Sequence, residues 1–130
     1  MSRQAGVRAL PALLIALGVG QLVIGLLLWV FPGTFFEEIG PYGVRNDHYM
    51  GDVASFYLAL GAAAIVAARR PAWRVPVLAF ALLQYVLHSI NHLIDVGEAD
   101  PEWLGPGNLI SLVLTGALLA WMLSLAGRER

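Results

Sequence analysis

Four long apolar segments, separated by connections whose charges are sorted by sign, dominate this 130-residue chain. Seven of the eight Arg residues lie at the two ends of the chain or in the second connection: Arg3, Arg8, Arg69, Arg70, Arg74, Arg128 and Arg130. Eight of the nine acidic residues lie in or beside the first and third connections: Glu37, Glu38, Asp47, Asp52, Asp95, Glu98, Asp100 and Glu102. Arg45 and Glu129 are the exceptions. A chain that crosses a bilayer four times places these two sets of connections on opposite sides, so the pattern predicts a membrane protein.

The length of the segments and the signs of the connections predict a fold and an orientation. Each segment has about 20 residues, enough to cross a hydrocarbon core of about 30 Å. Short connections make consecutive helices antiparallel neighbours, and basic loops stay in the cytoplasm. We expect residues 1–130 to form one all-α integral membrane domain in the plasma (inner) membrane. It would be a four-helix up-down-up-down transmembrane bundle with both termini cytoplasmic. Its expected spans are residues 10–31, 48–68, 73–96 and 107–126.

Residues that start and stop helices support these limits. Pro11 suits a first helical turn, and Pro32 ends the first span. Asn46 or Asp47 is suited to cap the second span. The breaker pair at 105–106 precedes the fourth. The aromatic and glycine residues of the first connection predict a segment that lies at the membrane interface or folds over the mouth of the bundle.

The composition limits the classes of protein to which the chain belongs. Its charged fraction is 13%, about half of the usual soluble value. Membrane topology accounts for the Arg residues, so no basic patch remains for a nucleic acid. Cysteine is absent from the sequence, which excludes a disulfide, a thiolate nucleophile and a cysteine metal site. The first segment is too long for a secretory signal and lacks a small-x-small cleavage motif, so we interpret it as a retained span.

The second and third spans carry polar residues that a lipid-facing helix should not carry. On the third span, the spacing i, i+4, i+7, i+8, i+11 places on one stripe Gln84, His88, Asn91, His92 and Asp95. On the second span, the spacing i, i+4, i+7 does the same for His48, Asp52 and Ser55.

These two stripes reach similar depths. Measured along each helix from the basic end, His88 and His92 lie at ~21 and ~27 Å, and Asp52 and His48 at ~25 and ~31 Å. If the stripes face each other, the side chains meet in the outer third of the bundle. Imidazole and carboxylate groups are good ligands for Zn, Fe or Cu, so we expect these four residues to form a metal site. Hydrogen bonds from the remaining polar residues would orient the imidazole rings: Gln84, Asn91 and Asp95.

A structural role is the alternative for each polar residue taken singly. Asp52 can pair with a histidine in a buried hydrogen bond, and Gln84 and Asn91 can link helices. His48 and Asp95 lie at span ends, where polar groups cost little. For the whole group we favour a functional site, because ionisable residues inside a membrane usually mark one.

The first and fourth spans carry weaker signals. One face of the first span holds Gly18, Gln21 and Gly25, and one face of the fourth holds Asn108, Ser111 and Thr115. We interpret the small residues, together with 61–64 of the second span, as sites of close helix packing. Tyr57 and Tyr85 are interpreted as packing residues that could also border a cavity.

Three stretches, FPGTFF, GPYGVRNDHYMGDVASFYLALG and LHSINHLID, resemble small four-span actinobacterial membrane proteins that are loosely similar to the DoxX-like proteins. Such relatives carry Asn-x-His-x-x-Arg-Asp before the second span and His-x-x-x-His on the third. The matching positions here are Asn46, His48, Asp52, His88 and His92, with Gly51 in place of the Arg. The resemblance implies a membrane bundle and a link to quinone or thiol redox systems, while the missing Arg weakens any case for an anionic substrate.

Three functions follow from these patterns, and the sequence leaves open whether the chain is an enzyme. The first is a metal-binding site with possible redox activity at His48, Asp52, His88 and His92. In a variant of it, haem b is held by His48 with His88 or His92. The second is a metal-free binding protein or enzyme for a quinone, sterol or isoprenoid, in which a histidine and Asp52 act as an acid–base pair. The third is a non-catalytic subunit, in a homo-oligomer or a larger membrane complex. A proton or ion channel is disfavoured, because the inner half of each span lacks a polar path.

Overall fold

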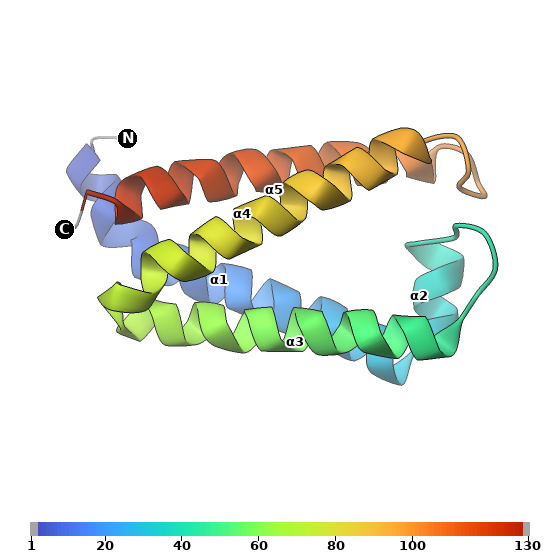
Figure 1. Cartoon of the computed structure of the whole chain (residues 1–130), viewed down its shortest axis with the longest axis horizontal. Helices are drawn as coiled ribbons and strands as arrows, with labels where there is room; N and C mark the ends of the chain where they lie inside the picture. Colours follow the sequence, from blue (N-terminus) through green and yellow to red (C-terminus); the bar gives the residue numbers. More distant parts are fainter. Residues whose placement is uncertain (1–2, 129–130) are drawn as a thin grey trace.

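The computed structural model describes residues 3–128, which contain five α-helices and no strand. The helices are α1 (Arg3–Val30), α2 (Pro32–Glu38), α3 (Asp47–Arg69), α4 (Pro71–Ile94) and α5 (Leu104–Ala126). Figure 1 shows the four long helices packed lengthwise, with the short α2 lying across one end. Each expected span therefore overlaps one long helix over most of its length, and α2 was not predicted from the sequence.

The four long helices are long and apolar enough to cross a membrane. Their outer surfaces carry large apolar side chains such as Leu26, Phe80 and Leu114, each more than half exposed. A water-soluble protein rarely exposes continuous apolar surface of this kind. The chain is a multi-pass membrane protein whose apolar outer surface faces lipid.

The bundle is a ring of four helices with two distinct ends (Figure 1). Around the ring, α1 packs on α3, α3 on α4, α4 on α5 and α5 on α1. At one end, called here the basic end, the α3–α4 turn lies with the start of α1 and the end of α5. The other end, called the mouth, carries α2 and the connections 39–46 and 95–103.

Glycines bring α1 and α3 into close contact. A Cβ atom on Gly18 would lie 2.8 Å from the Gly61 carbonyl oxygen, and one on Gly61 would lie 2.8 Å from the Gly18 carbonyl oxygen. Farther toward the mouth, a Cβ on Gly25 would lie 3.1 Å from the Ala54 carbonyl oxygen. This order of contacts makes α1 and α3 antiparallel. It confirms the expected packing role of these small residues.

The main apolar core lies toward the basic end. Its fully buried large side chains are Leu10, Leu14, Leu78, Leu119 and Met122. At the mouth a smaller cluster is formed by Leu28, Ala54 and Tyr57, against which Phe35 of α2 packs. The mouth half is therefore less completely filled by apolar side chains, and the candidate site lies there.

The two mouth connections are held together by backbone contacts. Tyr42 and Ala99 form an isolated antiparallel bridge, and the Asp100 N–H donates to the Pro41 carbonyl at 3.3 Å. Ile39, Gly40 and Tyr42 of the first connection also line the cavity described below. The first connection thus folds over the mouth, one of its two predicted positions.

The expected helix limits differ from the structure at two prolines. Pro11 was expected in a first turn but lies inside α1, which begins at Arg3. The additional turns are packed, because Leu10 is fully buried and a Cβ on Gly6 would lie 3.2 Å from the Leu125 side chain. Pro106 lies in the first turn of α5 instead of before it. A proline is tolerated there because its missing N–H would have no partner within the helix.

One of the basic residues has a structural role. Arg74, which was counted with the second connection, lies within α4 and is buried. Its guanidinium donates to the carbonyl oxygens of Ala67 at 3.2 Å and Ala68 at 3.1 Å. Carbonyls in the last turn of a helix have no partner within that helix, so Arg74 caps the end of α3.

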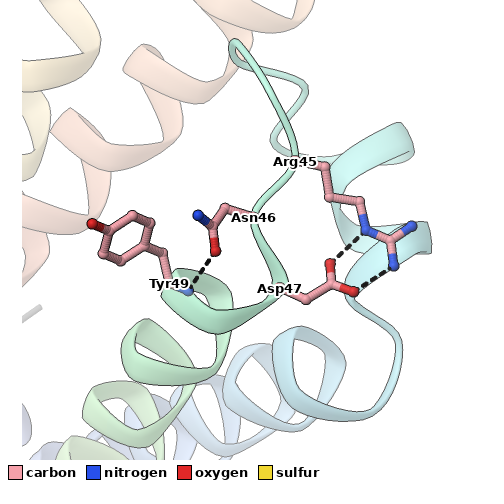
Figure 2. Close-up of polar contacts among 4 residues, drawn as sticks. All are labelled: Arg45, Asn46, Asp47 and Tyr49. Atoms are coloured by element: carbon pink, nitrogen blue, oxygen red, sulfur yellow. Dashed lines mark hydrogen bonds and ion pairs between the residues drawn. The ribbon is translucent and has the colours of Figure 1, made fainter.

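Arg45, the one arginine at the mouth among the described residues, is paired with an acidic residue at the start of α3. Arg45 forms two hydrogen bonds with the Asp47 carboxylate, Nε to Oδ1 at 2.6 Å and Nη2 to Oδ2 at 2.9 Å (Figure 2). The bond to this carboxylate raises the pKa of the Arg45 guanidinium. Beside the pair, Asn46 accepts from the Tyr49 N–H at 3.2 Å and is the N-cap of α3. The exceptional positive charge is therefore paired locally.

Candidate functional site: a polar cavity at the mouth

A cavity of about 370 Å³ opens between the helices at the mouth. All five helices and the connection after α2 contribute to its walls. The apolar part of the wall includes Ile24, Leu28, Phe35, Val53 and Leu112. The polar part consists of Tyr42, Tyr57, Tyr85, His88, His92, Asn108, Ser111 and Thr115. A concave site with apolar walls and a few convergent polar groups is the usual form of a small-molecule site.

The polar groups form a chain along one wall. Gln84 Nε2 lies 3.5 Å from His88 Nδ1, and His88 Nε2 lies 3.1 Å from His92 Nε2. His92 Nδ1 lies 3.1 Å from the Tyr42 hydroxyl, against which its ring also packs edge-on. Asn108 Nδ2 lies 3.4 Å from the same hydroxyl and donates to the Ile39 carbonyl at 2.8 Å. Helices α4 and α5 and the first mouth connection are thereby joined.

One assignment of the histidine tautomers gives every contact in this chain of polar groups one donor and one acceptor. If Gln84 donates to His88 Nδ1, then His88 carries its proton on Nε2 and donates to His92 Nε2. His92 then carries its proton on Nδ1 and donates to the Tyr42 oxygen. With this assignment two donors, His92 and Asn108, point at the Tyr42 oxygen, so the hydroxyl hydrogen of Tyr42 is available to an acceptor in the cavity.

A buried polar contact joins α1 to one residue of the cavity wall. The Gln21 side chain of α1 donates from Nε2 to the Tyr85 hydroxyl at 2.7 Å. Both residues are about 95% buried. Tyr57 and Tyr85 both line the cavity, as the sequence analysis allowed.

The structure brings together only two of the four residues expected to bind a metal. His88 and His92 line the cavity. His48 and Asp52 instead form an exposed pair on α3, with 3.7 Å between Nε2 and Oδ2 and side-chain exposures of 84% and 66%. Within residues 3–128, no three or more His, Asp or Glu side chains form a group able to hold a metal ion. The expected four-ligand set is therefore not assembled here.

The rotation of α3 about its axis explains this difference. Ala54 and Tyr57 are buried against the neighbouring helices. A helix turns about 100° per residue, so His48 lies about 180° around α3 from Tyr57. The face that carries His48 and Asp52 is therefore turned away from the bundle, while the small residues of the opposite face are needed for contact with α1.

Of the three residues expected to orient the histidines, one contacts a histidine and two contact each other. Gln84 contacts His88, as predicted. Asn91 is exposed, and its side chain donates to Asp95 at 3.4 Å. For Asn91 and Asp95 a local link at the end of α4 replaces the expected bond to an imidazole.

Several cavity residues were not predicted as part of the site. Tyr42 was noted only as an aromatic residue of the first connection, and nothing in the local pattern indicates that it reaches His92, 50 residues away. Asn108, Ser111 and Thr115 were recognised as one face of a span but interpreted as packing residues. Their spacing of three and four residues was the available signal that they face a common space.

The fold and the cavity define a class of protein: a helical membrane bundle with a cavity at one end whose largely apolar wall carries a few polar side chains. No protein-family model, curated protein or solved structure matches this chain.

Proposed function

We propose that this chain binds a lipid-like molecule whose oxygen-bearing head, a carbonyl or a hydroxyl, lies in the mouth cavity. The observation that supports this most directly is the cavity of about 370 Å³, in which one wall is a connected chain of polar groups and the rest is largely apolar. Quinones, sterols and isoprenoids have heads and tails of this chemistry.

The polar chain has the chemistry to hold the oxygen of the head by a hydrogen bond. The Tyr42 hydroxyl donates its hydrogen to the head oxygen, while its own oxygen accepts from His92 Nδ1. His92 Nε2 in turn accepts from His88 Nε2 across their 3.1 Å contact, and His88 Nδ1 accepts from Gln84. Both imidazoles stay neutral, because every proton remains on its own nitrogen. His92 and Tyr42 thus take the place of the pair of a histidine with Asp52 that the sequence predicts.

The sorted charges support an orientation for this site. Arg8, Arg69 and Arg70 are exposed at the basic end, and positive loops stay in the cytoplasm. We therefore place both termini in the cytoplasm and the mouth at the outer face of the plasma membrane. The resemblance to DoxX-like proteins favours a quinone among the candidate ligands.

Lipid analysis of detergent-purified protein tests the proposal. Wild-type protein should retain one lipid species at about one molecule per chain, identified by mass spectrometry after extraction. His92→Leu should lose it, because the variant breaks the polar chain. His48→Leu is the matched control, since His48 is exposed and outside the cavity. The same mixture of bulk phospholipids in all three samples would contradict the proposal.

A metal ion at His88 and His92 is the second candidate. Their Nε2 atoms are 3.1 Å apart, and two nitrogens each about 2.0–2.1 Å from a metal would then subtend about 100° at it. The Nδ1 atoms contact Tyr42 and Gln84, the kind of support that metal-binding histidines have. The pair supplies two of the three or four protein donors of a usual Zn, Fe or Cu site.

The same three purified proteins test this candidate. Stoichiometric Zn, Fe or Cu in wild type and His48→Leu, but not in His92→Leu, would favour the metal over the lipid-like ligand. An absorption spectrum of the same proteins tests the haem hypothesis, in which His48 and a second histidine hold haem b. Because that hypothesis requires the exposed His48 as an axial ligand, a Soret band that survives His48→Leu would contradict it.

A further inference from the structure

A lipid-facing groove follows the seam between α3 and α4. It consists of two adjoining hollows of about 690 and 480 Å³. The first extends from Trp73, near the basic end, to Phe56 and Phe80, and the second continues from this pair to Leu87 and His88. The walls are predominantly apolar. In Figure 1, α3 and α4 meet at their connection near the basic end and separate toward the mouth.

The groove and the mouth cavity share a wall. Val53, Tyr57 and His88 line both the mouth cavity and the second hollow of the groove. Gln84 also lines this hollow, and its Oε1 atom is buried without a hydrogen-bond partner among the described residues. Buried polar atoms without a partner are uncommon in proteins, and this one lies where the groove meets the mouth cavity. The polar chain thus continues to the point where the groove begins.

The length of the groove is enough for one hydrocarbon chain. From Trp73 to His88 along α4 the groove extends over ~22 Å at 1.5 Å per residue. Its outer side is formed by exposed apolar residues in the part of the helices that faces lipid, including Phe80, Leu83 and Leu87. A molecule dissolved in the bilayer can therefore reach the groove sideways, without passing through water.

We propose that the α3–α4 groove holds the tail of a single-tailed lipid whose head reaches the mouth cavity past His88. This inference rests on the proposed function and adds the class of ligand and its route, which is lateral entry from the bilayer. It places the head beside Tyr42 and His92, and the tail beside Phe56, Phe80 and Ala63.

Two quinones that differ only in their tails test the inference. One is ubiquinone-0, which has no tail, and the other is ubiquinone-4, which has four isoprene units. Binding is followed by quenching of tryptophan fluorescence in nanodiscs. The variant is Ala63→Phe, which fills the groove. The control is Ala62→Phe, which adds the same ring to an exposed neighbour that is not among the groove residues.

The tail should matter only while the groove is open. Wild type and Ala62→Phe should bind ubiquinone-4 at least about tenfold more tightly than ubiquinone-0, because the tail buries apolar surface. Ala63→Phe should lose this advantage and retain its affinity for ubiquinone-0, which also shows that the variant is folded. Equal affinity of wild type and Ala63→Phe for ubiquinone-4 would contradict the groove as the site of the tail, and would leave the proposal that the mouth cavity binds the head. Failure of both quinones to bind wild type would contradict the proposal that the mouth cavity binds a carbonyl head.

Discussion

At the scale of single residues, the contact between Gln21 and Tyr85 is the clearest example of a polar pair kept inside the bundle. The two side chains join α1 and α4, which are opposite each other in the ring and have no close backbone contact among the described residues. Water is absent from a bilayer core, so each group depends on the other for its hydrogen bond. The pair therefore ties the bundle across its diagonal.

This dependence predicts an asymmetry between single and double variants. Tyr85→Phe leaves the buried Gln21 amide without its acceptor and should lower the free energy of unfolding by about 1–3 kcal/mol. Gln21→Leu combined with Tyr85→Phe should recover most of that loss, because no polar group remains unpaired. The measurement is unfolding of the purified protein by increasing mole fractions of SDS. Gln21→Leu is also measured alone. If the double variant loses at least as much free energy of unfolding as the two single variants lose together, the pair is not coupled.

At the scale of helices, close contact between α1 and α3 depends on the absence of side chains at two positions. Gly61→Ala should lower the free energy of unfolding by about 1–3 kcal/mol, because its Cβ would press on the Gly18 backbone and force the helices apart. Gly20→Ala is the control, since its Cβ would have no neighbour within 4 Å. That control should be neutral or stabilising by up to about 1 kcal/mol. Equal effects of the two substitutions in SDS unfolding would reject a packing role for Gly61.

At the scale of the whole molecule, the orientation can be read with single cysteines, because the natural sequence contains none. Val44→Cys places a thiol at the mouth, where Val44 is 92% exposed, and Gly127→Cys places one at the basic end. A membrane-impermeant maleimide should label Val44→Cys in intact cells and Gly127→Cys only after lysis. The reverse pattern would place the mouth in the cytoplasm.

Much of the helix arrangement could be predicted because it depends on local composition and periodicity. The four apolar segments, the Asn46 cap and the small-residue faces of α1 and α3 were all recognisable in the sequence. The pairing of His88 with His92 follows in the same way, since residues four apart on a helix are neighbours whatever surrounds them.

The site was only partly predictable, because depth along a helix does not specify its rotation. His48 lies at a depth suited to the expected site, yet the packing of α3 on α1 turns it outward. Tyr42 could not be assigned to His92, because their contact depends on how the first connection folds over the mouth.

The amino-acid sequence by itself determined that four apolar helices form, which end of the bundle is basic, and which polar residues lie at the depth of the mouth. Only the tertiary structure decided which of those residues share a cavity, because interhelical packing sets the rotation of each helix. In α3 that packing requires the glycine and alanine face to point inward, so His88 and His92 meet Tyr42 while His48 and Asp52 remain outside.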